Sequence, residues 1–148
     1  MADDKIFFIS VTGIVVKDGK FLIVKRSEKE KAFPGRWTVP GGKMQRTDYA
    51  HKTPNAGGLW YEVAEDVLRR EVKEEANLDV QNIRYVTSIA YVRPDGNHCV
   101  ILSYACDHKG GDVKLCDALT EHAWVTLEEA KKYDLIDGIY DELKLVAQ

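Results

Sequence analysis

The chain of 148 residues has the length of a single domain and is long enough to bury a sizeable hydrophobic core. Its composition is that of an ordinary soluble globular protein, with 45% hydrophobic and 30% charged residues. Because the chain has 21 Lys and Arg residues and 24 Asp and Glu residues, its net charge is −3, which argues against a general affinity for nucleic acid or for an anionic membrane surface.

The three cysteines indicate a reducing compartment. Cys99, Cys106 and Cys116 are odd in number and form no C-x-x-C pair, so neither a disulfide framework nor a zinc site is expected. The apolar run near the N-terminus follows two aspartates instead of basic residues, and it is too short to span a bilayer. We therefore expect a cytoplasmic protein without a membrane segment, folded as one domain over residues 1–148.

The first predicted elements are two strands. Residues 6–16 and 20–25 are rich in Ile, Val and Phe, and Lys17-Asp18-Gly19 separates them, which is typical of a β-hairpin. The stretch WTVPGGK, residues 37–43, predicts a short strand that ends in a glycine turn. From residue 44 to 58 the chain has neither the helical nor the strand period, so we expect a long insertion loop there that is functional or mobile.

A helix is predicted next, from about Leu59 to Ala76, and Asn77 suits the left-handed conformation that ends many helices. The remaining predicted elements, in chain order, are strands near 79–92, 98–106 and 122–125 and helices near 127–132 and 137–146. This mixture of hairpins, strands and helices indicates an α/β (α+β) fold with a mixed β-sheet flanked by helices.

Three glutamates crowd one side of the predicted helix. At about 100° per residue, Glu71, Glu74 and Glu75 lie within roughly 60° of one another, in the same sector as apolar residues such as Val67. Acids that face the body of a protein need a counter-charge, and Arg70 alone cannot neutralise three of them. Mg²⁺ or Mn²⁺ could do so, since both accept carboxylate oxygens. The alternative is that this end of the helix protrudes into solvent, and periodicity alone does not decide between the two.

The wider pattern resembles the Nudix box, G-x5-E-x7-R-E-U-x-E-E-x-G-U, in which U is a bulky aliphatic residue. The stretch REVKEEANL, residues 70–78, carries the R-E-U-x-E-E core, Glu62 precedes that stretch by eight residues, and PGGK at 40–43 is similar to the segment that supplies the first glycine. There are two departures. Asn77 replaces the second glycine, and 19 residues instead of five lie between the first glycine and Glu62, which is an insertion of 14 residues.

The resemblance extends over nearly the whole chain and implies a Nudix fold, with a mixed β-sheet sandwiched between helices. The insertion could displace the glycines from the helix, but the intact acids favour a loop that bulges out and folds over the substrate. The implied activity is that of a metal-dependent pyrophosphohydrolase, which cleaves the diphosphate bond of a nucleoside triphosphate or another nucleoside diphosphate derivative by water attack at phosphorus. The implied cofactor is Mg²⁺, with Mn²⁺ as a substitute.

The resemblance also assigns roles to the residues of the box. Glu74 and Glu75 would be metal ligands, together with the backbone carbonyl of Gly41. Glu71 would be a metal ligand or the general base that takes the proton of the attacking water. Arg70 would orient Glu71 through a charge-assisted hydrogen bond.

Candidates outside this core are less specific. Glu62 would be an accessory ligand or a structural partner, and Glu121 would be a further metal ligand, with a plain surface acid as the alternative. The candidates for substrate binding are Arg26, Arg36, Trp37 and Lys43. The basic side chains suit phosphate oxygens and the tryptophan could stack on a base, whereas the alternatives are solvated surface charges and a core position.

Three functional classes compete. The intact box acids favour a hydrolase over a nucleotide-sensing module, which usually lacks them. A diphosphate isomerase of related fold would require a catalytic cysteine before the box, and none of the three cysteines lies there. The short chain and the WTVPGGK stretch are similar to members that act on nucleoside triphosphates. Pro94, 16 residues after Leu78, favours ADP-ribose or a nucleotide sugar instead, but it also suits an ordinary turn. The expected partner is a small-molecule nucleotide, without nucleic acid or membrane, and a homodimer is left open.

Overall fold

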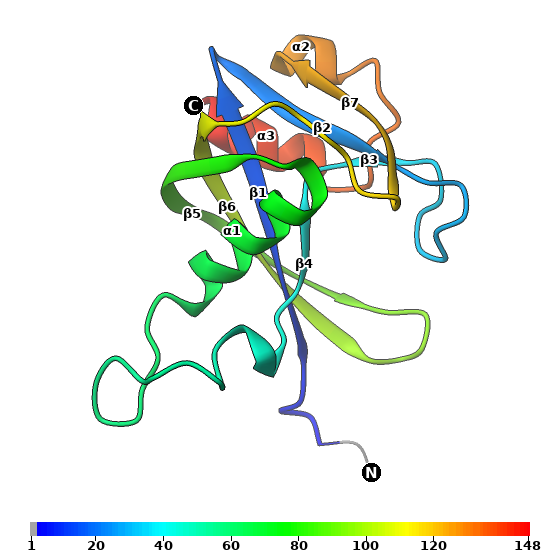
Figure 1. The fold of residues 1–148 in the computed structure, drawn as a ribbon. Helices are drawn as coiled ribbons and strands as arrows, with labels where there is room; N and C mark the ends of the chain where they lie inside the picture. The colour runs from blue at the N-terminus through cyan, green and yellow to red at the C-terminus, as the bar shows by residue number, and fades with distance from the viewer. Residues whose placement is uncertain (1–2) are drawn as a thin grey trace.

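The computed structural model describes residues 3–148, which form one mixed β-sheet with helices packed on both faces (Figure 1). The strands are β1 (Phe8–Lys17), β2 (Lys20–Arg26), β3 (Trp37–Thr38), β4 (Gly41–Lys43), β5 (Asp79–Val92), β6 (His98–Gly110) and β7 (Leu119–Val125). The helices are the 3-10 helix η1 (Arg46–Asp48), α1 (Val63–Ala76), α2 (Leu127–Ala130) and α3 (Ile139–Ala147). The predicted α/β (α+β) class is confirmed. Between residues 3 and 148, no helix combines the length and the apolar character needed to cross a membrane.

The sheet is built around β1. Its strand order is β3-β2-β1-β6-β5, with β4 paired to β1 and β7 paired to β2. β1 and β6 are parallel, and the other pairs are antiparallel. The β1–β2 connection turns at Asp18 and Gly19, whose φ angles are 51° and 75°. Positive φ at both central residues matches the twist of a tight hairpin, so the predicted hairpin is confirmed.

The two faces of the sheet bury two separate sets of apolar side chains. Successive side chains of a strand point to opposite faces, so Val11 and Val15 of β1 lie in the core beneath α1, whereas Ile14 lies in the core beneath α2 and α3. The buried residues that α1 contributes are Val67, Leu68, Val72 and Ala76. Those that the other two helices contribute are Ala130, Ile139 and Leu143. Burial of this apolar stripe fixes α1 on the sheet, and the acids near its C-terminal end are fixed with it.

Helix α1 begins four residues later than the sequence predicts. It starts at Val63, because Glu62 takes a left-handed conformation with φ of 58° and the carbonyl of Leu59 accepts from the N–H of Asn55 at 2.8 Å. Two further bonds tie the preceding residues to the insertion. Trp60 donates its Nε1–H to the carbonyl of Lys52 at 2.8 Å. The backbone N–H of Tyr61 donates to Oδ1 of Asn55 at 3.0 Å. At the other end, the helix terminates at Ala76 as predicted.

The glycines before the insertion lie in a strand and not in the predicted turn. Gly41 and Gly42 of β4 pair with Thr12 and Val11 of β1 in antiparallel register. Two later strands are also longer than predicted, since β6 extends to Gly110 and β7 begins at residue 119. In each case the extra length comes from pairing with a distant strand, which no local pattern indicates.

The insertion at 44–58 leaves the sheet after β4 and returns to the start of α1 (Figure 1). It contains the short helix η1, which the sequence analysis did not predict and which adds no residue to either apolar core. The backbone N–H of Met44 donates to the carbonyl of Ile9 at 2.7 Å, which anchors the start of the insertion to β1. Apart from Met44, whose side chain packs against the core beneath α1, the insertion lies outside the two cores, and it is held at both ends.

Candidate active site

The acids of the box lie where the C-terminal half of α1 passes β4. Glu75 accepts a hydrogen bond of 2.7 Å from the backbone N–H of Gly41. The carboxylate of Glu71 lies directly against Gly42, so that a Cβ atom at Gly42 would overlap it. A Cβ atom at Gly41 would in turn collide with the backbone of β1. The two glycines thus allow the helix acids to approach the strand closely.

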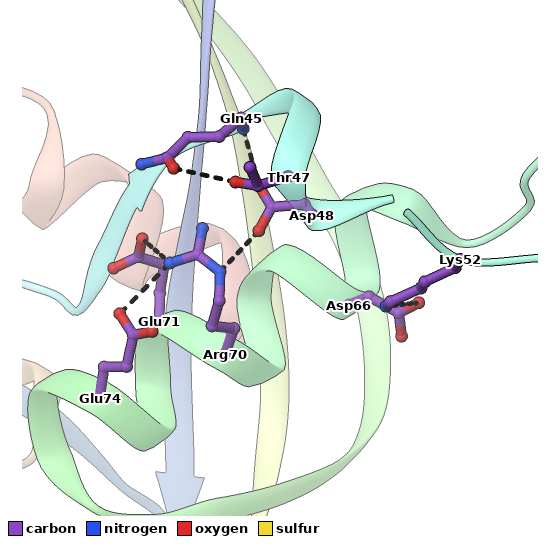
Figure 2. A network of polar contacts seen from close by, with 8 residues as sticks. All are labelled: Gln45, Thr47, Asp48, Lys52, Asp66, Arg70, Glu71 and Glu74. Atoms are coloured by element: carbon purple, nitrogen blue, oxygen red, sulfur yellow. Dashed lines mark hydrogen bonds and ion pairs between the residues drawn. The ribbon is translucent and has the colours of Figure 1, made fainter. Parts of the chain in front are cut away.

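Arg70 links the acids to one another and to the insertion, as Figure 2 shows. Its Nη1 donates to Oε1 of Glu71 at 2.9 Å and to Oε2 of Glu74 at 3.2 Å. Its Nε donates to Oδ1 of Asp48, a residue of η1, at 2.6 Å. Asp48 was not among the residues predicted from the sequence, because an isolated acid in an aperiodic loop carries no signal. The observed contact between Arg70 and Glu71 is the one that the resemblance implied.

Burial and mutual repulsion shape the acidity of the two inner glutamates. Burial raises the pKa of Glu71, and repulsion from Glu74 adds to it, while Arg70 acts in the opposite direction. Burial raises the pKa of Glu75 to about 7, although the hydrogen bond from Gly41 lowers it, and repulsion from Glu71 raises it further. Both carboxylates therefore resist carrying their charge in the absence of an additional cation.

The Asp48–Arg70 pair behaves differently. Burial acts to raise the pKa of Asp48, but the hydrogen bonds from the backbone of Gln45 and from Arg70 outweigh it, so that the pKa lies below its ordinary value. Burial acts to lower the pKa of Arg70, and the hydrogen bond to Asp48 together with the attraction of Glu71 outweighs it. Both members of this pair are therefore charged at neutral pH.

The donor set suits a hard divalent cation, although the side chains do not form a ready-made cage. Over residues 3–148, no group of three or more His, Cys, Asp or Glu side chains is arranged closely enough to hold a metal ion. Arg70 is the cation that contacts Glu71 and Glu74. Carboxylate oxygens are nevertheless the ligands that Mg²⁺ and Mn²⁺ prefer, and the raised pKa values of Glu71 and Glu75 mark the place where an added cation would relieve most repulsion.

Two of the predicted outer residues lie on the β2–β7 pair. Glu121 faces Lys25 across this pair and forms an ion pair with it at 3.3 Å. Arg26 donates from Nε to the carbonyl of Ala32 at 2.8 Å, and its positive charge acts to lower the pKa of Glu75. Arg26 is thus electrostatically coupled to the box, whereas the observed partner of Glu121 is a lysine.

The other predicted substrate-binding residues make contacts elsewhere. Arg36 donates from Nη2 to the carbonyl of Leu135 at 2.5 Å and pairs with Asp134 at 3.2 Å. Trp37 packs edge-on against Tyr133, with ring centroids 4.8 Å apart. For Lys43, the observed contact is a cation–π approach of 5.5 Å to the ring of Phe8. Glu62 occupies the left-handed position before α1, with φ of 58°. Substrate binding by Arg36, Trp37 and Lys43, and an accessory role of Glu62, stay predictions.

A small hollow lies beside the box, between the insertion and the start of α1. Its volume is about 160 Å³, and its lining includes Asp48, Tyr49, Asn55, Trp60 and Asp66. A larger hollow of about 430 Å³ lies near Leu78 and Gly110, and no box acid lines it. The hollow under the insertion adjoins the Arg70 network through Asp48, whereas no residue of that network lines the larger hollow.

Comparison with known proteins identifies the family. A model of the NUDIX domain matches residues 8–144. The chain belongs to this family. Among curated relatives, the nucleoside triphosphatase NudI of Salmonella agona (strain SL483) is 28% identical over 136 residues, covering 84% of this chain and 86% of the relative. NudI of Escherichia coli O81 (strain ED1a) is 27% identical with the same coverage.

Solved structures of Nudix proteins share the fold. A MutT NUDIX hydrolase from Burkholderia pseudomallei superposes with a TM-score of 0.75 at 21% identity, covering 96% of this chain and 99% of the other. The NUDIX domain of Shewanella oneidensis NrtR, solved in complex with ADP ribose, superposes with a TM-score of 0.72 at 17% identity, covering 96% and 87%. The predicted Nudix fold and the prediction of a Nudix hydrolase are both confirmed.

Proposed function

We propose that this Nudix hydrolase cleaves the diphosphate bond of a nucleoside triphosphate by water attack at phosphorus, with Mg²⁺ or Mn²⁺ as its cofactor. The observation that supports this most is the gathering of Glu71, Glu74 and Glu75 around Arg70 beside the β4 glycines. The triphosphatase name of the curated relatives supports the choice of substrate class. We also infer that residues 1–148 act as one domain.

Each box residue has a task that its contacts suit. Glu74 and Glu75, with the backbone carbonyl of Gly41, would hold the cation, which when bound neutralises phosphate charge and lowers the pKa of a water ligand. Glu71 would serve as a further ligand or as the general base, with its carboxylate oriented by Arg70 at 2.9 Å. The hydrogen bond from Gly41 holds Glu75 in place before any cation arrives. Enzymes catalyse phosphoryl transfer mainly by positioning the reacting groups and by stabilising charge, which is what these contacts would do.

Residues farther from the acids would bind the substrate. Arg26 is charge-coupled to Glu75 and would meet phosphate oxygens near the metal. Glu121 would be a further metal ligand, and its observed partner is Lys25 at 3.3 Å. ADP-ribose or a nucleotide sugar is the alternative substrate, which Pro94 favours. However, Pro94 lies within a turn closed by the Gly96 N–H and the Arg93 carbonyl at 2.9 Å, and this turn accounts for it without a ligand.

The proposal is tested by assaying nucleoside triphosphates, ADP-ribose and nucleotide sugars with Mg²⁺, with Mn²⁺ and with EDTA, and identifying the products. We expect a nucleoside triphosphate to be hydrolysed only when a divalent cation is present. Glu71→Gln, Glu74→Gln and Glu75→Gln should each lower kcat by roughly two orders of magnitude or more, the scale of losing a general base or a metal ligand.

The matched control is Asp79→Asn, which removes an exposed ion pair between Lys73 of α1 and β5 and should leave kcat unchanged. Hydrolysis that persists in EDTA would contradict the metal dependence. Hydrolysis of ADP-ribose in preference to every triphosphate would replace the proposed substrate with the alternative one.

A further inference from the structure

One side chain of the insertion reaches the arginine of the box. Asp48 lies in η1, and its side chain is only 5% exposed. Its Oδ1 accepts from Nε of Arg70 at 2.6 Å, the shortest of the three contacts that Arg70 makes with acids (Figure 2). We propose that Asp48 is a positioning residue, which fixes Arg70 and thereby orients Glu71 for cation binding and hydrolysis. The inference deepens the proposed function and rests on it.

The contacts of Arg70 explain why its orientation depends on Asp48. Glu71 and Glu74 both accept from the same nitrogen of Arg70, Nη1. These two acids therefore hold the guanidinium group at a single point. Nη2 is buried and has no hydrogen-bond partner within the described residues. Nε is therefore the second point of attachment, and a planar group held at two points keeps a defined orientation. Without Asp48, Arg70 would pivot about Nη1, and the carboxylate of Glu71 would move with it.

Asp48 is itself held in place by the insertion. Its Oδ2 accepts from the backbone N–H of Gln45 at 2.7 Å, and its own N–H donates to the carbonyl of Gln45 at 3.0 Å. The first of these bonds is the Asp48 half of a capping box, and the second closes the backbone turn of η1. The anchor of Met44 on β1 then connects η1 to the sheet. Asp48 is thus a fixed acceptor and not a mobile surface acid.

The balance of charge around Arg70 also predicts that loss of the Asp48 carboxylate weakens cation binding. One guanidinium meets three carboxylates, those of Asp48, Glu71 and Glu74. Asp48 takes part of the attraction of Arg70, which leaves the two glutamates less fully compensated and more attractive to a divalent cation. Neutral asparagine at position 48 would remove one negative charge from the site and leave Arg70 to Glu71 and Glu74 alone. Cation affinity should then fall.

The test compares Asp48→Asn with wild type by kinetics and by Mn²⁺ binding. We expect kcat to fall by roughly tenfold to a hundredfold, with KM changed by less than about twofold, because outer partners of metal ligands typically act on this scale. The Kd for Mn²⁺ in the absence of substrate, measured from the free-ion spin-resonance signal, should rise several-fold. Asp79→Asn, which breaks an ion pair of α1 away from the insertion, should change neither quantity.

A double-mutant cycle decides whether Asp48 acts through Arg70. Arg70→Lys keeps the positive charge but has no Nε fork, so adding Asp48→Asn to it should lower kcat little further. Additive losses would overturn the proposal. If Asp48→Asn only speeds tryptic cleavage after the exposed Arg46 and Lys52 while kcat and the Mn²⁺ Kd stay at their wild-type values, Asp48 is a tether of the loop and the proposal fails.

Failure of the proposed function is distinguishable from failure of this inference. Wild-type protein that hydrolyses no compound of the panel would overturn the proposed activity. The Mn²⁺ Kd ratio of Asp48→Asn to wild type would then decide the role of Asp48 by itself, a several-fold rise supporting it and an unchanged value overturning it.

Discussion

Glu75 is the residue whose environment differs most from that of a free glutamate. Its side chain is partly buried between α1 and β4, and burial raises its pKa from 4.5 to about 7. The hydrogen bond from Gly41 opposes this shift but does not cancel it. Because the folded protein holds the proton more tightly than the unfolded chain, the charged form of Glu75 destabilises the fold. Such a destabilisation is expected at Glu75 if it holds the cation of the proposed function.

The pH dependence of metal-free stability follows from this shift. Protonated Glu75 contributes stability to the fold relative to its charged form. This contribution is fully present below about pH 4.5, the ordinary pKa, and is lost as the pH rises through about 7. Glu75→Gln removes the titration, so its free energy of unfolding in EDTA should match wild type near pH 4 and exceed it by roughly 3 kcal/mol near pH 8. Denaturant unfolding at the two pH values measures the difference. Saturating Mg²⁺ should reduce or reverse the gain at pH 8, and an advantage that is equal at both pH values would disprove the assignment.

At the scale of elements, the site depends on the contact between α1 and β4. The apolar stripe of α1, which includes Val67 and Val72, seats the helix on the sheet. Glu71 and Glu75 lie in the same angular sector as this stripe, so they face β4 and not solvent. The contact is possible because Gly41 and Gly42 have no side chains. A charge cluster that periodicity alone left undecided is thus directed inward, against the glycine strand.

Gly42→Ala tests this contact. The added Cβ would overlap the carboxylate of Glu71, which is the flexible end of a side chain and can move aside. The backbone of Gly42 pairs with Val11 in an ordinary strand, so the fold should survive with a Tm shift of no more than a few degrees. We expect kcat to fall by roughly tenfold to a hundredfold, as for other small misplacements of a catalytic group. Gly110→Ala, where the nearest atom lies 4.0 Å away, is the matched control and should keep full activity. Wild-type kcat in Gly42→Ala would show that Glu71 works from a different position.

At the scale of the whole molecule, the insertion adds to the site while contributing one partly buried side chain, Met44, to the core beneath α1. No residue of η1 belongs to either apolar core, and the buried residues of both cores come from the sheet and the three α-helices. The insertion still touches the box through Asp48 and forms, with the start of α1, the hollow of about 160 Å³. Its position beside the Arg70 network is that expected of a segment which shapes substrate choice.

Replacing residues 44–58 with a five-residue link tests whether the insertion acts only through the Asp48–Arg70 contact or also through the hollow that it lines. The shortened protein should unfold cooperatively, because the buried residues of both cores remain. Its kcat should fall at least as far as that of Asp48→Asn, and its order of preference among substrates should change because the hollow is lost. Kinetics over the full substrate panel measure both effects. An unchanged order of preference, with a loss equal to that of Asp48→Asn, would mean that the insertion acts through Asp48 alone.

The sequence by itself determined the elements whose signals are local. Asp18 and Gly19 indicate the first hairpin because their left-handed conformations belong to the turn itself. Asn77 ends α1 for the same reason, with φ of 62°. The spacing of the box acids determined the family, and the contact of Arg70 with Glu71 joins neighbouring residues. Signals of this kind depend on a few adjacent residues and are therefore readable before the chain folds.

Only the tertiary structure decided the features that join distant parts of the chain. The start of α1 at Val63 depends on the left-handed conformation of Glu62 and on the insertion, whose Asn55 N–H takes the Leu59 carbonyl that an earlier helix start would use. The strand conformation of Gly41 and Gly42 depends on pairing with β1. The partnership of Asp48 with Arg70 spans 22 residues of an aperiodic loop. A loop of this kind carries no period, so its acid finds the arginine only because the folded chain brings η1 against α1.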